Sequence, residues 1–133
     1  MIPAARPEIG DEERAAVDRV MRSGMLAQGP EVAAFESEFS AIVNGMHSIA
    51  VNSGTSALHM AFLAAGVGAG DEVIVPSFSF AATANAVALA GATPVFVDIE
   101  LDHFNAAPAA IEAAITPRTR AIMPVHLYGH PAD

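Results

Sequence analysis

The fold is decided by the stretch Val51-Asn52-Ser53-Gly54-Thr55-Ser56-Ala57-Leu58-His59-Met60. The β-branched run at 48–51 predicts a buried strand, and the apolar run at 55–65 is long enough for a helix. A turn of small, hydroxyl-rich residues separates them. The first N–H groups of a helix lack internal partners and lie at the positive end of its dipole. This strand–turn–helix corner therefore suits an anion, above all a phosphate group.

Three residues of the corner are candidates for holding that phosphate. Gly54 lets the backbone approach a ligand closely, and Thr55 or Ser56 can cap the helix or bind a phosphate oxygen. The alternative is that Thr55 is only a helix cap and Gly54 only a turn residue. Familiar motifs do not fit, because the chain has no lysine for a Walker loop and too few glycines here for a dinucleotide fingerprint. A nucleophile elbow would need glycine at position 58, which is Leu58.

Composition narrows the class of protein. The 133 residues are 53% apolar with a mean hydropathy of +0.41, above the roughly 45–50% apolar content of ordinary domains. This excess predicts a deeply buried sheet, a partner surface or a missing remainder. A net charge of −9 argues against nucleic acid as a partner. No apolar run reaches the roughly 18 residues of a membrane span. The start of the chain has no signal-peptide pattern and there is no cysteine, so we expect a cytoplasmic protein without a membrane partner.

The pattern of elements predicts two parts. Residues 1–46 should hold two amino-terminal helices and the loop 24–29, and residues 47–133 should alternate strands with helices. Apolar strands separated by helices are typical of a parallel sheet covered on both faces, so we predict an α/β three-layer sandwich. The helices expected at 55–65 and 80–90 are apolar nearly all round and should be buried. The expected strands are 48–51, 72–75, 94–98 and 120–125, and the expected helices are 55–65, 80–90 and 108–115.

Ligands of parallel sheets bind at the carboxyl ends of the strands, where the loops 52–56, 76–80 and 126–130 should meet. The second loop carries Phe78 and Phe80, and an aromatic ring there could stack on a flat ring held by its phosphate. The alternative is that both phenylalanines are core residues. His126 and His130 are four residues apart, but Gly129 and Pro131 argue against a helix, so we predict no metal site.

Four blocks, in this order and spacing, resemble the DegT/DnrJ/StrS sugar aminotransferases, which are fold-type I enzymes that use pyridoxal 5'-phosphate (PLP). The blocks are NSGTSAL at 52–58, GAGDEVIVPSFSF at 68–80, GATPVFVDI at 91–99 and ITPRTRAIMPVHLYG at 115–129. The resemblance extends from about residue 7 to the end of the chain. It implies that residues 47–133 are an incomplete part of the large PLP-binding domain.

The resemblance also implies roles for individual residues. Gly54, Thr55 and Ser56 would hold the cofactor phosphate, and Phe80 would stack on the pyridine ring. The loop 24–30 would lie near the substrate mouth. Members of the family aminate nucleotide-linked keto-sugars, usually with glutamate as the amino donor. They are homodimers whose active sites are built from both subunits.

Two departures from the family pattern matter. Ala107 stands where members usually carry aspartate before Pro108, which predicts a helix without a side-chain cap. The second departure is that the chain has neither the family's Schiff-base lysine nor the acid that keeps the pyridine nitrogen protonated. We therefore expect an amino-terminal fragment that cannot transaminate by itself. The alternatives are a sugar dehydratase of the same family, with histidine in place of the lysine, and a non-catalytic interaction module. A nicotinamide-dependent oxidoreductase is disfavoured by the absence of its glycine fingerprint.

Overall fold

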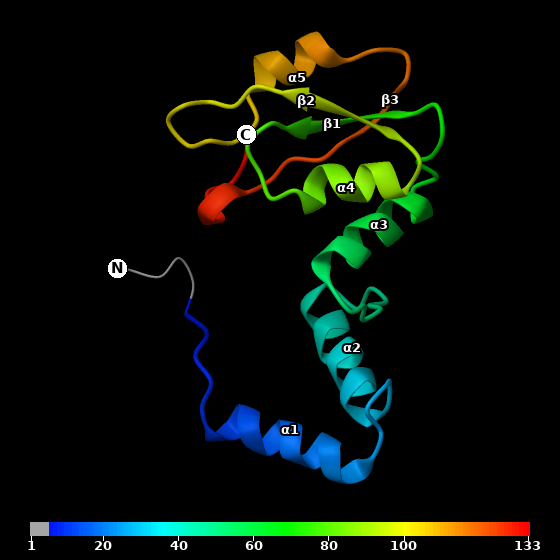
Figure 1. Ribbon diagram of the computed structural model, residues 1–133, viewed down its shortest axis with the longest axis vertical. Coiled ribbons are helices and arrows are strands. Elements are labelled where there is room, and N and C mark those ends of the chain that lie inside the picture. Colours follow the sequence, from blue (N-terminus) through cyan, green and yellow to red (C-terminus); the bar gives the residue numbers. More distant parts are fainter. Residues whose placement is uncertain (1–5) are drawn as a thin grey trace. The chain divides into compact units, whose positions relative to one another are not determined.

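The computed structural model describes residues 6–133 (Figure 1). Residues 1–5, which contribute to the expectation of no signal peptide, lie outside the described residues. The contacts divide the chain into two units, residues 1–50 and residues 51–133.

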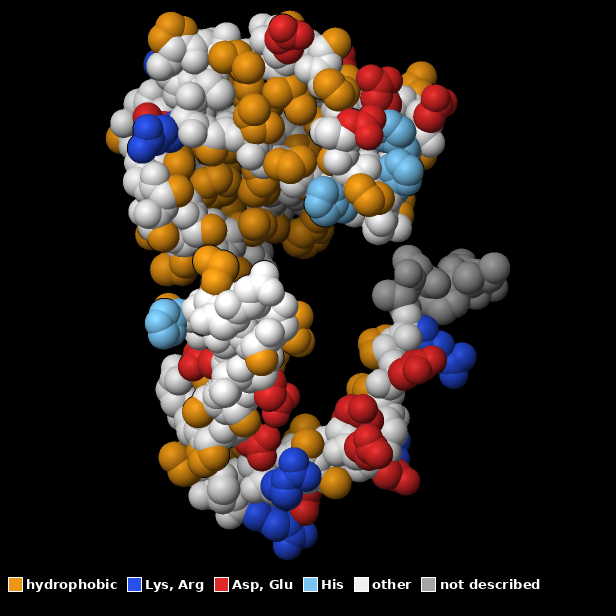
Figure 2. Space-filling model, turned by 180° about the vertical axis from the view of Figure 1, so that it is seen from behind, with side chains coloured by type: hydrophobic (Ala, Val, Ile, Leu, Met, Phe, Trp, Pro, Cys, Tyr) orange, Lys and Arg blue, Asp and Glu red, His pale blue; other side chains and the backbone are white. Residues whose placement is uncertain are grey.

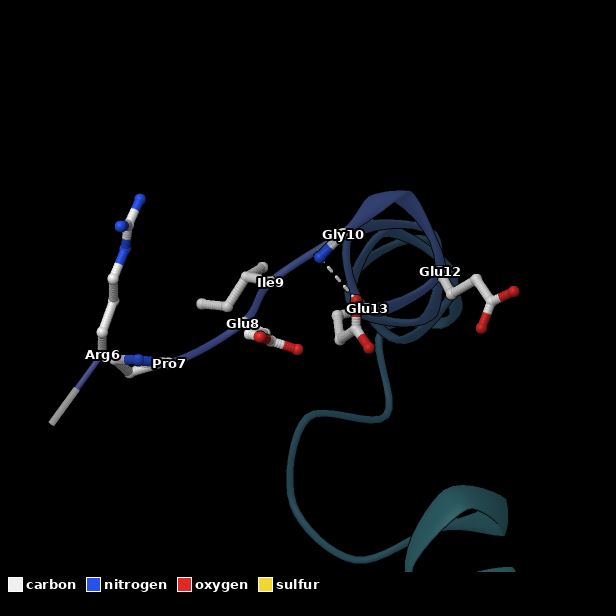
Figure 3. Close-up of a pocket in the computed structure, with 7 residues that line it drawn as sticks. All are labelled: Arg6, Pro7, Glu8, Ile9, Gly10, Glu12 and Glu13. Atoms are coloured by element: carbon white, nitrogen blue, oxygen red, sulfur yellow. Dashed lines mark hydrogen bonds between the residues drawn. The ribbon is translucent and has the colours of Figure 1, made fainter.

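The first unit consists of α1 (Asp11–Ser23) and α2 (Pro30–Ile42). At the start of α1, the Gly10 N–H donates a hydrogen bond of 2.7 Å to Glu13 Oε2 (Figure 3). The backbone N–H groups of Glu13 and Gly10 lower the pKa of the Glu13 carboxyl, and the negative charge also complements the helix dipole. α1 ends at Gly24 in the left-handed conformation, at φ 71°.

Among the described residues of the first unit, neither helix contains a buried residue. On α2, the rings of Phe35 and Phe39 lie 5.9 Å apart, yet these side chains are 56% and 46% exposed. Two short helices without a buried face gain little hydrophobic stabilisation. Residues 6–50 therefore have no apolar core of their own.

The second unit is an α/β arrangement. Its elements are α3 (Gly54–Ala64), β1 (Glu72–Pro76), α4 (Ala82–Leu89), β2 (Thr93–Val97), α5 (Pro108–Ala114), β3 (Thr119–Ile122) and the short 3-10 helix η1 (Leu127–Gly129). The described strands form one parallel sheet in the order β2-β1-β3, which confirms the predicted fold class. The chain moves from β1 out to β2 and then back past β1 to β3. Because such crossovers are right-handed, this reversal places α4 and α5 on opposite faces of the sheet (Figure 1).

β1 is the centre of the core, and all five of its residues are buried. Its side chains alternate between the two faces. Val73 and Val75 pack with Phe62 of α3 and with the buried face of α4, while Ile74 packs with Val97 under α5. The core therefore has one layer on each side of a single strand.

The predicted strand at 48–51 is wrong. This segment pairs with no strand among the described residues, and the Ala50 N–H instead donates 2.8 Å to Glu36 Oε1. A β-branched run indicates an extended backbone, but a strand also needs a partner on the sheet. The predicted burial of the first of the two apolar helices is wrong as well. Only Phe62 of α3 is buried, and Met60 and Leu63 are 50% and 48% exposed.

Smaller differences have local causes. α4 begins at Ala82 rather than at position 80, because the residues before it form the turn that leaves β1. β3 ends at Ile122 rather than at position 125, and Pro124 beyond it has no N–H for a sheet ladder. α5 has no side-chain hydrogen bond at its N-cap residue Ala107, as its sequence predicts.

A polar cluster joins β1 to β3 at the amino-terminal edge of the sheet. The Glu72 side chain, in a residue only 8% exposed, accepts hydrogen bonds from Thr116 Oγ1 and from the guanidinium of Arg118, whose Nε lies 2.9 Å from Oε1. The Glu72 N–H also donates to the Arg118 carbonyl at 2.8 Å. The hydrogen bonds from Thr116 and then Arg118 lower the pKa of the Glu72 carboxyl.

This cluster predicts an acid-dependent stability. A carboxyl whose pKa is lowered by folding stabilises the protein above its ordinary pKa of 4.5 and loses that contribution as the pH falls below it. Glu72→Gln should therefore lower the melting temperature near neutral pH and should flatten its decline in acid. Glu112→Gln, at an exposed position of α5, is the matched control. Equal acid sensitivity of the Glu72→Gln variant and the unchanged protein would contradict this role.

Candidate functional site

The corner before α3 has two backbone donors left for a ligand. Ser53 is the N-cap residue, and its Oγ accepts the Ser56 N–H at 3.1 Å. The Ala57 N–H donates to the Ser53 carbonyl at 3.0 Å. Within the described part of the chain, the N–H groups of Gly54 and Thr55 have no such acceptor. These two donors lie at the positive end of the α3 dipole, where an anion is stabilised.

Gly54 has no structural reason to be glycine within the second unit. It is the first residue of α3, it is not among the glycines with positive φ, and a Cβ built on it would meet no atom within 4 Å. Neither a positive φ nor a contact with a Cβ therefore requires glycine at this position. The open space beside this position is room for a group that approaches the Gly54 N–H.

An open concavity of about 890 Å³ lies next to these donors. It is found at the carboxyl ends of β1 and β3, which are neighbours in the sheet. The carboxyl ends of the strands are where parallel sheets bind ligands. The lining comes from α3 and its cap, from the β1–α4 turn and the start of α4, and from the segment after β3: Ser53, Gly54, Thr55, Ala57, Leu58, Ala61, Ser79, Phe80, Ala82, Thr83, Met123, Pro124 and Val125.

Phe80 faces this concavity with 80% of its surface exposed. Phe78 is 47% exposed and pairs instead with Phe104, at a ring-centroid distance of 5.8 Å. The alternative that both phenylalanines are core residues is therefore wrong. An exposed ring beside a hollow offers a flat face on which a ligand ring can stack.

The structure brings together Gly54, Thr55 and Phe80 of the predicted site residues, since all three line the concavity. Ser56 does not line it. Its hydroxyl donates to Asn52 Oδ1 at 2.7 Å and lies 3.0 Å from Ser53 Oγ, so it supports the corner from within. Sequence reasoning overlooked Ser79 and Thr83, two hydroxyl residues four positions apart that flank Phe80. That spacing around an aromatic residue was the available signal.

A second hollow, beside the start of α1, fits a phosphate-bearing ligand less well. The hollow shown in Figure 3 is lined by Arg6 but also by the carboxylates of Glu8, Glu12 and Glu13, which would repel a phosphate.

Within residues 6–133, no three His, Cys, Asp or Glu side chains come together as metal ligands. His130 instead stacks on His103 at 5.1 Å. No helix in the described range is long and apolar enough to cross a membrane.

Comparison with known proteins gives a consistent match. Residues 7–133 match the model of the DegT/DnrJ/EryC1/StrS aminotransferase family. DesV of S. venezuelae, solved in complex with a ketimine intermediate, is 52% identical with a TM-score of 0.84 over 92% of this chain and 33% of its own. Spr1654 from Streptococcus pneumoniae, assigned as a sugar aminotransferase and solved in its PMP form, is 37% identical with a TM-score of 0.91 over 99% of this chain and 33% of its own.

NtdA from Bacillus subtilis, with bound cofactor PMP, is 41% identical with a TM-score of 0.85 over 94% of this chain and 30% of its own. The chain therefore spans about a third of the length of the solved proteins that it matches.

The cap of α3 yields a prediction about stability. Ser53→Ala removes the hydroxyl that accepts the Ser56 N–H, and losing such a cap costs about 1 kcal/mol of unfolding free energy. Ser37→Ala, at an exposed position inside α2, is the matched control and should not destabilise the protein because alanine is the better helix former. Denaturant unfolding of both variants measures the difference. A Ser53→Ala variant as stable as Ser37→Ala would show that the cap does not hold the corner.

Proposed function

The chain belongs to the DegT/DnrJ/EryC1/StrS aminotransferase family, and we propose that its concavity holds pyridoxal 5'-phosphate in a complete enzyme that aminates a nucleotide-linked keto-sugar. Glutamate is the proposed amino donor. The observation that carries the proposal is the convergence of two unpartnered backbone N–H groups and one exposed aromatic ring on the same hollow. A phosphate and a flat ring are the two parts of PLP that a protein must hold.

The residues present fit the cofactor. The phosphate would accept hydrogen bonds from the N–H groups of Gly54 and Thr55, with the Thr55 hydroxyl beside them. The pyridine ring would lie against Phe80. Much of the remaining lining is apolar, including Leu58 and Met123, so it would keep water away from the ring. The absence of a Cβ at Gly54 leaves the space that a phosphate needs to reach the backbone.

Bound PLP supplies the electron sink that lets an amino group move between carbon skeletons. This chain's residues would anchor and orient the cofactor in that reaction. The 133 residues contain no lysine, so we propose that the cofactor-binding lysine and the acid at the pyridine nitrogen belong to residues outside them. In this proposal the described unit is a binding scaffold, and the residues that move protons come from elsewhere in the complete enzyme.

The finer parts of the proposal rest on different support. The assignment of Spr1654 supports a sugar as the amino acceptor. The uncovered apolar side chains of α1 and α2, including Met21 and Phe35, need a covering surface, and a homodimer is the arrangement that we propose for the complete enzyme. The expected cytoplasmic location stays a prediction.

The reaction class is tested on the complete enzyme. Borohydride reduction in the presence of PLP should attach the cofactor covalently to a lysine, which mass spectrometry of the digested protein would locate. The dehydratase alternative has histidine at that position and would give no such attachment. If no covalent product forms in the unchanged enzyme, the proposed aminotransferase activity is contradicted.

Gly54→Val should leave the fold intact and weaken PLP binding. A Cβ at this position meets no protein atom within 4 Å, but the valine side chain would occupy the space through which the phosphate reaches the backbone. We expect an unchanged melting temperature of the cofactor-free protein and an increase of at least about tenfold in the PLP dissociation constant. Cofactor affinity equal to that of the unchanged protein would remove Gly54 from the site.

Phe80→Ala should also weaken PLP binding, because it removes the ring against which the cofactor would stack. Such aromatic contacts contribute about 0.5–1.5 kcal/mol, equivalent to a roughly two- to tenfold increase in the dissociation constant. Phe96→Ala is the matched control, since Phe96 is 59% exposed on β2 and does not line the concavity. Equal affinities of the two variants would contradict a role for Phe80.

A further inference from the structure

Phe80 has no neighbouring ring to hold it. It is 80% exposed, and the described aromatic pairs do not include it. Its position must therefore come from the backbone turn between β1 and α4. A ring that must lie flat against a cofactor loses affinity if its turn moves, because binding then has to order it.

That turn is closed by a pair of hydroxyl groups. Ser79 Oγ and Thr83 Oγ1 lie 2.8 Å apart, and these two residues stand on either side of Phe80 in the sequence. The Thr83 N–H also donates to the Phe80 carbonyl at 3.0 Å. Thr83 thus holds the backbone of Phe80 through its amide and the residue before it through its side chain.

The usual way to fix the start of a helix is not used here. The N-cap residue of α4 is Ala81, which makes no side-chain cap bond. Thr83 is only 6% exposed although it lines the concavity, so its hydroxyl is placed at the inner wall and is already paired with Ser79. A buried hydroxyl with a satisfied partner stabilises one geometry of the turn.

We propose that Ser79 and Thr83 are positioning residues that act as one unit to set the orientation of Phe80 toward the ligand ring. The inference rests on the proposed cofactor function and extends it to two residues that do not themselves need to contact the cofactor. Breaking the hydroxyl pair loosens the turn, and the free energy of binding then includes the cost of ordering Phe80.

The test is a mutant cycle in the complete enzyme. Ser79→Ala and Thr83→Val each remove one hydroxyl, and each should raise the PLP dissociation constant about three- to tenfold. The double variant should be no weaker than the weaker single variant, because either change already breaks the pair. Visible circular dichroism of the bound cofactor should change in the same variants. Thr83→Ser retains the hydroxyl and should leave both the PLP dissociation constant and the circular dichroism as in the unchanged enzyme.

The same substitution in a protein that lacks the Phe80 ring distinguishes a positioning role of Thr83 from direct contact with the cofactor. In a Phe80→Leu protein, Thr83→Val should have no further effect on PLP affinity if Thr83 acts through Phe80. An undiminished effect in that background would show direct contact with the cofactor and overturn the inference. Thr93→Val, at an exposed position of β2, is the matched control and should bind PLP like the unchanged protein. Melting temperatures of the cofactor-free variants report any loss of fold, and Ser79→Ala decides the question if Thr83→Val does not fold.

The outcomes also separate this inference from the proposed function. An unchanged enzyme that binds PLP, together with pair variants of equal affinity and equal circular dichroism, would overturn the positioning role and leave the cofactor site standing. An unchanged enzyme that binds no PLP would overturn both.

Discussion

The parallel pairing of β1 with both β2 and β3 is the constraint on which the site depends. Parallel strands end at the same edge of a sheet, so the turn after β1 and the segment after β3 must come together there. Both of these segments line the same hollow, at the edge where parallel sheets bind ligands. β1 can occupy this central place because both of its faces are apolar and covered.

Polar groups at this edge are few and have separate tasks. The hydroxyls of Ser53 and Ser56 are used to close the corner before α3, which leaves the backbone donors of Gly54 and Thr55 free. The Ser79–Thr83 pair is used within its own turn. A ligand with one strongly anionic group and one flat ring therefore matches what the hollow leaves available.

The sequence contained enough to predict the alternating α/β pattern and the corner, because each follows from local composition or spacing. Composition left Phe78 and Phe80 as equal candidates, and only the family resemblance singled out Phe80. The prediction of a strand at 48–51 was wrong because β propensity does not say where a partner strand lies. The Ala50 N–H donates to the Glu36 carboxylate instead. The prediction that α3 is buried was wrong for a related reason. An apolar helix indicates that some surface covers it, and among the described residues α4 covers only one side.

At the proposed site, too, some features follow from the local sequence and others depend on the tertiary structure. Gly54 and Thr55 line the hollow, whereas Ser56 turns its hydroxyl to Asn52, a choice made by side-chain geometry that spacing does not reveal. The pairing of Ser79 with Thr83 likewise became visible only when the turn was seen in three dimensions. Residue type predicted which groups are available, and the fold decided how each is used.

A crystal structure of the complete enzyme grown with PLP is the most direct test of the account. It should show phosphate oxygens at about 2.7–3.2 Å from the backbone nitrogens of Gly54 and Thr55 and the pyridine ring against Phe80. A cofactor bound away from this corner, or a phosphate held without these two N–H groups, would contradict the central claim.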